Sequence, residues 1–261
     1  MRVVIIGKRS FLSKKLNKFI PKSELVSSNF LKNKKYIKKY ITNNTCYIIN
    51  SFYPLFKILR DETNNREMIF QSAIYLTRLI NLLSKKKNIK ILYSSTCAVS
   101  DFNSKIYNSR SVYTSIKIIC EQLLKEYCSL SKTPLIITRL FNLYGGDDKA
   151  SIIYKIINAD KDSKIKINNN GNSKRDFIHV DDVANIYKKL INTGYTGHVE
   201  IGTGKSVSIK SLIKYNKNYI LNKKKLKESN VSIAKTKILS KFINVKKFLK
   251  VENYVKDSVK K

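Results

Sequence analysis

Short apolar runs that alternate with helical patterns constrain the fold of this chain most strongly. The runs lie at residues 2–6, 46–51, 89–96 and 134–140. Between them, apolar residues recur at helical spacing, most clearly at 66–84 and from Tyr113 onwards. Unbroken apolar runs of this length suit strands that are buried on both faces of a parallel sheet. Because strands alternate with helices, we expect an α/β fold with a doubly wound parallel sheet.

The second half of the chain divides between this sheet and a smaller lobe. Residues 1–144 are expected to form a Rossmann-like, dinucleotide-binding domain, and residues 176–200 are expected to return to it. Residues 145–175 and 201–261 contain turns, short helical segments and a strongly basic end. These two segments predict a small C-terminal α/β lobe that binds substrate.

The turn after the first strand has the arrangement of a dinucleotide site. Gly7 ends the strand and a helical pattern follows, which would place phosphates on the helix N-terminus. Ser10 and Ser13 stand where a dinucleotide fingerprint has its second and third glycines, so the fingerprint is incomplete. We expect five residues of this turn to contact the cofactor: Gly7, Arg9, Ser10, Phe11 and Leu12.

The charge of this turn bears on which dinucleotide is bound. The second strand, predicted within residues 23–28, ends without the Asp or Glu that would hydrogen-bond an adenosine ribose diol. Lys8 and Arg9 instead place two cations in the first turn, which suits a 2′-phosphate. We therefore expect NADP, with NAD as the alternative if these cations are simply two more basic residues.

The formal net charge of +34 does not by itself indicate nucleic-acid binding. Lysine greatly outnumbers arginine, the charges are spread along the chain, and no recognition motif for DNA or RNA is evident. No apolar run reaches the ~20 residues that span a bilayer, and the N-terminus lacks a signal-peptide pattern. We expect no nucleic acid, no membrane insertion and a cytoplasmic protein. The cysteines have no metal-like or disulfide-like spacing: Cys46, Cys97, Cys120 and Cys128.

Tyr113 and Lys117 form the candidate proton-transfer pair. Four residues apart on a helix, they lie one turn apart on the same face. A phenol titrates near pH ~10, and an adjacent ammonium is expected to lower that pKa. The strand upstream ends in the hydroxyls of Ser95 and Thr96. Hydroxyls beside such a pair suit proton transfer to a carbonyl or alcohol oxygen.

Six motifs follow one another in a recognisable order. They are the Gly7 turn, Tyr93-Ser-Ser-Thr96, Tyr113-x-x-x-Lys117, Arg139-Leu-Phe-Asn142-Leu-Tyr144-Gly145, Arg175-Asp-Phe-Ile-His-Val-Asp-Asp-Val-Ala184 and Glu200-Ile-Gly-Thr-Gly204. Together they span nearly the whole chain, and the stretch from Arg175 is the most specific. Their order resembles the extended short-chain dehydrogenases/reductases of the NAD-dependent epimerase/dehydratase family, which act on nucleotide-activated sugars.

The resemblance implies a role for each matching catalytic position. Tyr113 would exchange a proton with the sugar oxygen, and Lys117 would lower the pKa of Tyr113 and hold the nicotinamide ribose. Thr96, with Ser95 beside it, would hydrogen-bond the same sugar oxygen and polarise a carbonyl. The cofactor supplies the hydride. The substrate would be a nucleotide-diphosphate sugar, which suggests a place in polysaccharide biosynthesis.

The resemblance also implies substrate contacts in the second half of the chain. Asn142 would contact the sugar diphosphate, and Arg175 would pair with a phosphate. The alternative for Arg175 is an ion pair with Asp176 or Asp181. His179 lies between two apolar residues, so we interpret it as a packed or hydrogen-bonded histidine rather than a catalytic base. At the helix that follows, we expect Asp181 or Asp182 to be the N-cap.

Three departures from the family pattern narrow the reaction. Cys97 and Ala98 follow Thr96, where the 4,6-dehydratases carry an Asp-Glu pair, so dehydration is not expected. Cys97 could contact substrate or act in acid-base catalysis. Residues 150–153 supply no histidine partner for such catalysis, which favours Cys97 as a residue beside Thr96 that takes no part in the reaction. Seventeen positions separate Thr96 from Tyr113, fewer than is usual in the family, so the substrate loop there is small.

These features favour an NAD(P)H-dependent reductase of a nucleotide-activated 4-keto (6-deoxy)sugar. Its chemistry needs only Tyr113, Lys117, Thr96 and the cofactor. A C4 epimerase that retains NAD is the alternative, and a non-catalytic binder of nucleotide sugars or polyanions is a further one. Family members commonly pair through two helices, which here would be residues 66–84 and 113–128. Both are rich in apolar positions, so we expect a homodimer.

Overall fold

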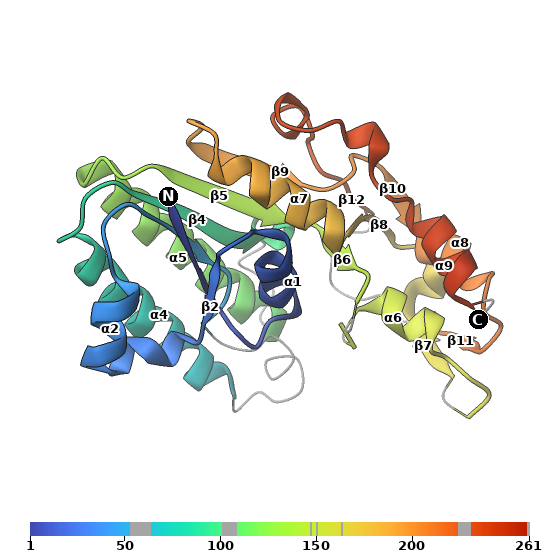
Figure 1. Ribbon diagram of the computed structural model, residues 1–261. Coiled ribbons are helices and arrows are strands. Elements are labelled where there is room, and N and C mark those ends of the chain that lie inside the picture. The colour runs from blue at the N-terminus through green and yellow to red at the C-terminus, as the bar shows by residue number, and fades with distance from the viewer. Residues whose placement is uncertain are drawn as a thin grey trace. The chain divides into compact units, whose positions relative to one another are not determined.

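The computed structural model describes residues 1–52, 64–100, 109–146, 148–149, 151–162, 164–223 and 231–259. The chain forms two compact units (Figure 1). The first comprises Met1–Arg139 and Tyr187–Val199, and the second comprises Leu140–Ile186 and Glu200–Lys261. The assignment of the second unit to substrate binding stays a prediction.

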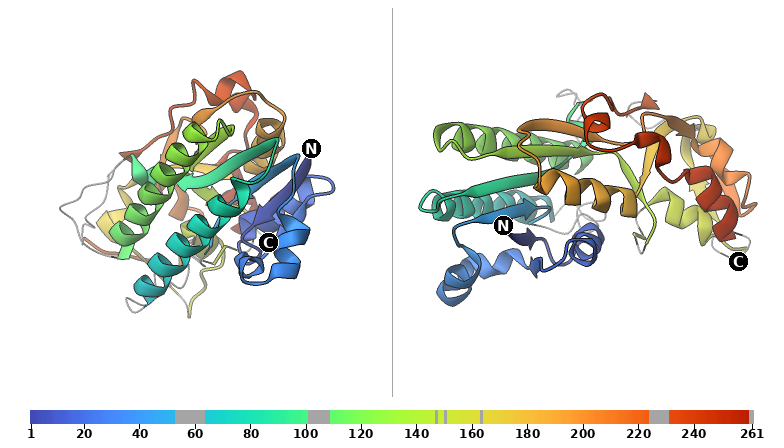
Figure 2. Two further views of the ribbon diagram at one scale, coloured as in Figure 1. Left: turned by 90° about the vertical axis from the view of Figure 1, so that its left-hand side faces the viewer. Right: turned by 45° about the horizontal axis from the view of Figure 1, so that its top comes forward.

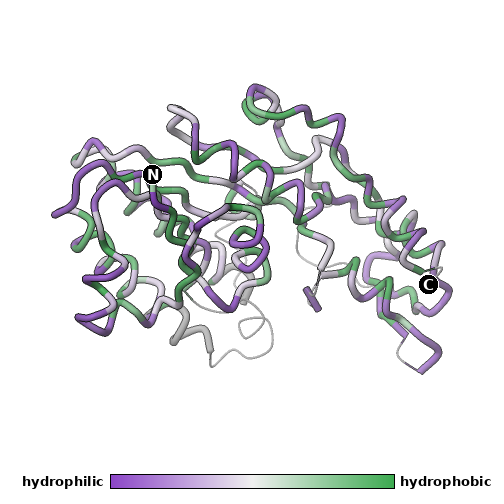
Figure 3. The backbone as a smooth tube through the Cα atoms, viewed as in Figure 1, coloured by the Kyte–Doolittle hydropathy of each residue, from purple (hydrophilic) through white to green (hydrophobic). Residues whose placement is uncertain are grey.

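The first unit is built on a six-stranded sheet. The strand order is β2-β1-β3-β4-β5-β9, and the described pairings from β2 to β4 are parallel. The strands are β1 (Arg2–Ile6), β2 (Glu24–Val26), β3 (Thr45–Ile49), β4 (Ile89–Thr96), β5 (Leu135–Leu140) and β9 (Gly197–Ile201). Every residue of β3 is buried, and β1 is a hydrophobic stretch in Figure 3. The predicted α/β class with a Rossmann-like parallel sheet is confirmed.

Two long helices cover one face of this sheet. The helices α4 (Asn64–Leu83) and α5 (Ser109–Leu130) lie side by side (Figure 2). The buried side chains of Leu76, Leu79 and Leu124 belong to one hydrophobic cluster with alternate residues of the central strands. The cluster includes Ile91 and Tyr93 of β4, as expected where every second side chain points to the same face.

The intervening residues of β4 contact the helix α7 (Val180–Ile191). The Ser94 hydroxyl lies 2.7 Å from the Tyr187 hydroxyl. The Lys90 ammonium donates to the carbonyl oxygens of Leu190 and Ile191 at the end of α7. These polar contacts on one face of β4 and the apolar cluster on the other show that helices cover both faces of the strand. The other helices among the described residues of this unit are α1 (Phe11–Phe19), α2 (Lys34–Tyr40) and the 3-10 turns η1 (Ser28–Lys32) and η2 (Cys97–Val99).

The described part of the second unit contains two smaller sheets. In the larger, β8 (Lys174–His179) lies between β10 (Ser206–Ser208) and β12 (Val231–Ser232), and also pairs with β6 (Asn142–Tyr144). In the smaller, β7 (Ile165–Ile167) pairs with β11 (Tyr219–Leu221). Besides the start of α7, the helices in the described residues of this unit are α6 (Ile152–Ile157), α8 (Ile209–Ile213) and α9 (Val251–Val259), with the 3-10 turns η3 (Asn168–Gly171), η4 (Leu239–Lys241) and η5 (Val245–Lys247). Their apolar residues form a separate core.

The start of α7 differs from the sequence-based expectation. The helix begins at Val180, so Asp181 and Asp182 lie inside its first turn, and neither is the N-cap. His179 precedes the helix, and its Nδ1 accepts a hydrogen bond from the Asp181 N–H at 3.2 Å. The Asp182 carboxylate accepts from the Leu249 N–H. The predicted cap is therefore wrong, although both acidic residues still suit the positive end of the helix dipole.

A buried carboxylate ties together three segments of the second unit. Asp176 in β8 has no exposed surface, and its carboxylate accepts hydrogen bonds from the Thr203 N–H and hydroxyl, the Gly204 N–H and the Ala234 N–H. A Cβ on Gly202 would lie 2.7 Å from Asp176 Oδ2, so only glycine fits this close approach. Such a fully satisfied carboxylate stabilises the loops on either side of β8.

We predict that Asp176→Asn destabilises the second unit by about 2 kcal/mol, because an amide cannot accept the full set of four hydrogen bonds. Urea unfolding followed by circular dichroism measures the change. Asp257→Asn, at an exposed position of α9, is the matched control and should unfold like the wild type. An unchanged midpoint in Asp176→Asn would contradict a structural role for this carboxylate.

Candidate active site

The structure brings Tyr113, Thr96 and Lys117 together at one end of the first unit's sheet. Thr96 is the last residue of β4; its hydroxyl accepts a hydrogen bond from the Ala98 N–H at 3.3 Å and lies close enough to Tyr113 on α5 to act to lower that pKa. One turn along α5, Lys117 Nζ donates to the Ser94 carbonyl oxygen at 2.7 Å and to the Asn50 carbonyl oxygen at 3.3 Å. Nζ lies 5.9 Å from the centre of the Tyr113 ring. The lysine is therefore anchored at the ends of two strands, beneath the tyrosine.

Burial sets the protonation of this pair. It raises the pKa of Tyr113 well above its ordinary value, and the Thr96 hydroxyl opposes it only in part. The pKa of Tyr113 is therefore raised overall, opposite to the predicted net lowering, because burial is the largest effect on it. Burial also lowers the pKa of Lys117 to about 8, while Cys120 and Glu121 act to raise it. Near neutral pH, Tyr113 holds its proton and Lys117 remains largely charged.

Ser95 and Cys97 lie on either side of Thr96 in the sequence but have different surroundings. The Ser95 side chain is buried, and its hydroxyl donates to Glu121 Oε1 at 2.5 Å. The Cys97 thiol is partly exposed and near enough to Tyr113 to act to raise that pKa. Thr96 is therefore the hydroxyl that acts on the pKa of Tyr113, whereas the Ser95 hydroxyl is bound to Glu121 of α5.

The partner of Ser95 belongs to an ion pair that sequence reasoning missed. Both oxygens of Glu121 accept hydrogen bonds from Arg139, from Nε at 3.2 Å and from Nη2 at 2.8 Å. Burial acts to raise the pKa of Glu121, but the bonds from Arg139 and Ser95 outweigh it and the pKa lies below its usual value. Glu121 stands four residues after Lys117, on the same face of the helix. This spacing was the signal in the sequence that could have placed Glu121 near the candidate site.

The dinucleotide turn has the shape that its sequence predicts. Gly7 adopts a φ of +123°, and a Cβ there would lie 2.9 Å from the Ser51 carbonyl oxygen. The chain then enters α1 at Phe11, and the first turn of α1 holds no acidic residue. Lys8 and Arg9 are exposed. A glycine turn that leads into a helix N-terminus without negative charge fits a pyrophosphate.

In the second unit, Asn142 and Arg175 lie on neighbouring strands. Asn142 Nδ2 donates to the Asp176 carbonyl oxygen at 2.9 Å. Arg175 is partly exposed, and its Nη1 donates to the Lys174 carbonyl oxygen. His179 is buried and its ring packs edge-on against Tyr144, so its interpretation as a packed, hydrogen-bonded histidine is confirmed.

The model of the NAD dependent epimerase/dehydratase family matches residues 2–202. The chain belongs to this family. CDP-abequose synthase from Salmonella muenchen is 28% identical over 213 residues, which cover 76% of this chain and 70% of that protein. dTDP-D-glucose 4,6-dehydratase from Dictyostelium discoideum is 31% identical over 112 residues, which cover 42% of this chain and 26% of that protein. The family predicted from the motifs is thus confirmed.

Solved structures of epimerase/dehydratase enzymes share the fold. UDP-N-acetylglucosamine 4-epimerase from Methanobrevibacter ruminantium M1 superposes with a TM-score of 0.79 at 18% identity, over 99% of this chain and 97% of that one. An NAD dependent NDP-hexosamine 5,6-dehydratase superposes with a TM-score of 0.82 at 16% identity, over 100% of this chain and 97% of that one. At these identities the likeness concerns the fold.

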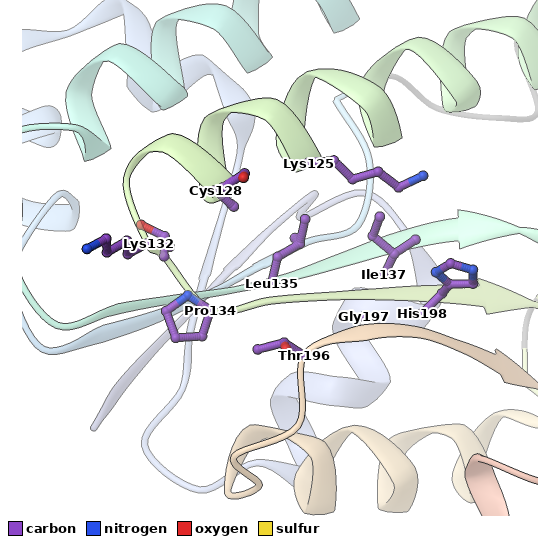
Figure 4. Close-up of a pocket in the computed structure, with 11 residues that line it drawn as sticks. Lys125, Cys128, Lys132, Pro134, Leu135, Ile137, Thr196, Gly197 and His198 are labelled. Carbon is purple, nitrogen blue, oxygen red and sulfur yellow. The ribbon is translucent and has the colours of Figure 1, made fainter.

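A surface hollow of about 400 Å³ lies elsewhere on the first unit (Figure 4). It is lined by residues of the C-terminal part of α5, of β5 and of the start of β9, including Lys125, Cys128 and His198. Lys125 follows Tyr113 by twelve residues on α5, a rise of about 18 Å. The hollow contains none of the predicted site residues, so it is separate from the candidate active site.

No helix in the described ranges is long and apolar enough to cross a membrane.

We predict that Glu121→Gln lowers the free energy of unfolding by about 2 kcal/mol at pH 7, because Arg139 loses a buried ionic partner. The folded-state pKa of Glu121 is depressed, so its contribution is present above the unfolded pKa and is lost as the pH falls. The difference between wild type and variant should therefore shrink from pH 7 to pH 4, as measured by urea unfolding.

The control for Glu121→Gln is Lys125→Gln. It removes the exposed lysine whose Nζ lies 4.0 Å from Glu121 Oε2. An exposed partner of this kind should contribute less than about 1 kcal/mol. Equal effects of the two substitutions would contradict the central role of the Glu121–Arg139 pair.

Proposed function

We propose that this protein is an NAD(P)H-dependent reductase of a nucleotide-activated 4-keto (6-deoxy)sugar. The observation that carries the proposal is the grouping of Tyr113 and Lys117 on one face of α5 beside Thr96 at the end of β4. Burial raises the pKa of Tyr113, which favours the neutral phenol. A neutral phenol is the form that gives a proton to a carbonyl oxygen during reduction. An oxidation would instead begin from the phenolate.

The chain's own residues would manage the proton and the developing charge. The cofactor supplies a hydride to the carbonyl carbon. Tyr113 gives its proton to the carbonyl oxygen, which becomes the hydroxyl, and Thr96 donates a hydrogen bond to that oxygen. The phenolate left behind is stabilised by the Lys117 ammonium one turn away. Cys97 and Ala98 supply no carboxylate for dehydration.

The dinucleotide would lie along the Gly7 turn. Gly7, Ser10, Phe11 and Leu12 would hold its pyrophosphate at the N-terminus of α1, and Arg9 with Lys8 would favour a 2′-phosphate. β2 ends at Val26 and no acidic residue follows it before η1, which supports NADPH over NADH. In the second unit, Asn142 and Arg175 would bind the substrate's diphosphate, and the excess positive charge of the chain would favour such an anion.

We predict that the purified protein consumes NADPH when given a nucleotide-linked 4-keto-6-deoxysugar. Tyr113→Phe should slow turnover at least about 100-fold, because the proton donor is lost, while NADPH binding stays intact. Absorbance at the nicotinamide band measures turnover. Tyr127→Phe, on the same helix, is the matched control and should keep turnover near that of the wild type.

Two outcomes would contradict the reductase proposal. Interconversion at C4 of a nucleotide sugar without NADPH consumption would identify a C4 epimerase with retained NAD. Binding of nucleotide sugar with neither activity would identify a non-catalytic binder. Turnover that survives in Tyr113→Phe would remove this tyrosine from the mechanism.

The helices α4 and α5 further support a homodimer. Both present apolar side chains to solvent: Ile69 and Ile74 are 42% exposed, Ile119 is 50% exposed and Leu123 is 39% exposed. Ile119 and Leu123 lie one turn apart, so they form a stripe on the outer face of α5. The same two helices of a second copy would cover this surface.

We predict that Leu123→Glu converts a dimer to a monomer, because it places a charge in the centre of this apolar stripe. Light scattering coupled to size-exclusion chromatography measures the mass. Leu221→Glu, at a 43% exposed leucine of the second unit, should leave the dimer intact. A monomeric wild type at micromolar concentration would contradict the homodimer.

A further inference from the structure

Asn50 connects the dinucleotide turn to the catalytic lysine. It follows β3 and is 7% exposed. Its side-chain Nδ2 donates to two hydroxyls, Ser10 Oγ and Ser13 Oγ, each at 2.8 Å. Its carbonyl oxygen accepts from Lys117 Nζ at 3.3 Å. One buried residue therefore contacts both parts of the candidate active site through different atoms.

The two serines that Asn50 binds are those that replace glycines in the fingerprint. Ser13 has no exposed surface, and its Oγ would lie 3.3 Å from a Cβ on Gly7. A hydroxyl enclosed in this way costs free energy unless it is hydrogen-bonded. The amide of Asn50 has two N–H groups and two serine acceptors, so it satisfies both hydroxyls at once.

The bond to Asn50 also changes what Ser10 does at the start of α1. A serine at the N-cap usually accepts a hydrogen bond from an N–H group of the helix's first turn. Ser27, Asn33, Ser151 and Ser208 do so at their helices. Ser10 is the N-cap of α1 and makes no such bond. The Ser10 hydroxyl therefore does not occupy the N–H groups in the first turn of α1, and a bound anion would not have to displace it.

We infer that Asn50 is a positioning residue for dinucleotide binding. It holds the hydroxyls of Ser10 and Ser13 away from the N-terminus of α1, so that the N–H groups there bind the pyrophosphate. It thereby allows serines at positions that otherwise need glycine. This role rests on the proposed function, because the bound group is the dinucleotide of the reductase.

The test is a cycle of variants in the full-length protein, with NADPH binding measured by titration of its fluorescence. Asn50→Ala should raise the Kd for NADPH about tenfold, because Ser10 is then free to cap α1 and compete with the pyrophosphate. At saturating NADPH, kcat should change less than about twofold, since the Asn50 carbonyl that holds Lys117 is unchanged. The same substitution in a Ser10→Gly, Ser13→Gly background should raise the Kd less than about threefold, since no hydroxyl remains to be restrained.

Controls separate positioning from a general loss of stability. Asn216 is a second buried asparagine, and its Nδ2 donates to the carbonyl oxygens of Ile156 and Ala159. Asn216→Ala should lower the melting temperature and leave the Kd for NADPH unchanged. If Asn50→Ala alone does not fold, the triple variant that combines it with Ser10→Gly and Ser13→Gly should fold and bind NADPH within about threefold of the wild type.

Three results would overturn the inference. They are a wild-type Kd in Asn50→Ala, an equal loss of affinity in the serine and glycine backgrounds, and a triple variant that folds but does not bind NADPH. A wild-type protein that binds neither NADPH nor NADH would instead overturn the proposed function, and the inference with it.

Discussion

The placement of the Lys117 ammonium is the interaction on which the candidate active site depends. Burying part of a cation is unfavourable, and this cost appears as the lowered pKa of about 8. The cost is offset by the carbonyl oxygens of Ser94 and Asn50, which belong to the ends of neighbouring strands. Because those strands are fixed by the sheet, the lysine fixes α5 relative to them. Tyr113, one turn earlier, then meets Thr96 at the end of β4.

Two polar clusters support this placement from either side. Glu121 joins Ser95 of β4 to Arg139 of β5, one turn beyond Lys117 on α5. Asn50 joins the end of β3 to the turn before α1. In open parallel sheets, ligands bind beyond the carboxyl ends of the strands, and all of these contacts lie there. The same edge therefore carries both the candidate reacting groups and the hydrogen bonds that orient them.

The sequence predicted the strands of the first unit and the grouping of Tyr113, Lys117 and Thr96, because both depend on local patterns. Helical spacing placed Tyr113 one turn from its lysine, but the direction of the Tyr113 pKa shift depends on burial, which spacing does not reveal. Partners far apart in the chain were also beyond the reach of local patterns, as for Asn50 and Ser10, which are 40 positions apart. Within the sequence, Ser10 and Ser13 indicate a damaged fingerprint. In the structure, both serines accept hydrogen bonds from the side chain of Asn50, which follows β3.

The scarcity of acidic residues explains how this chain stabilises its inner lysines. Fifty-two lysines and arginines face only 18 aspartates and glutamates, and Glu121 and Asp176 are already committed to Arg139 and to backbone N–H groups. Lys117 and Lys90 are accordingly held by main-chain carbonyl oxygens, two for Lys117 and three for Lys90. Carbonyls orient an ammonium without cancelling its charge. Lys117 therefore keeps a positive field at the strand ends. There the proposed reaction generates a phenolate, and the protein would bind anionic phosphates.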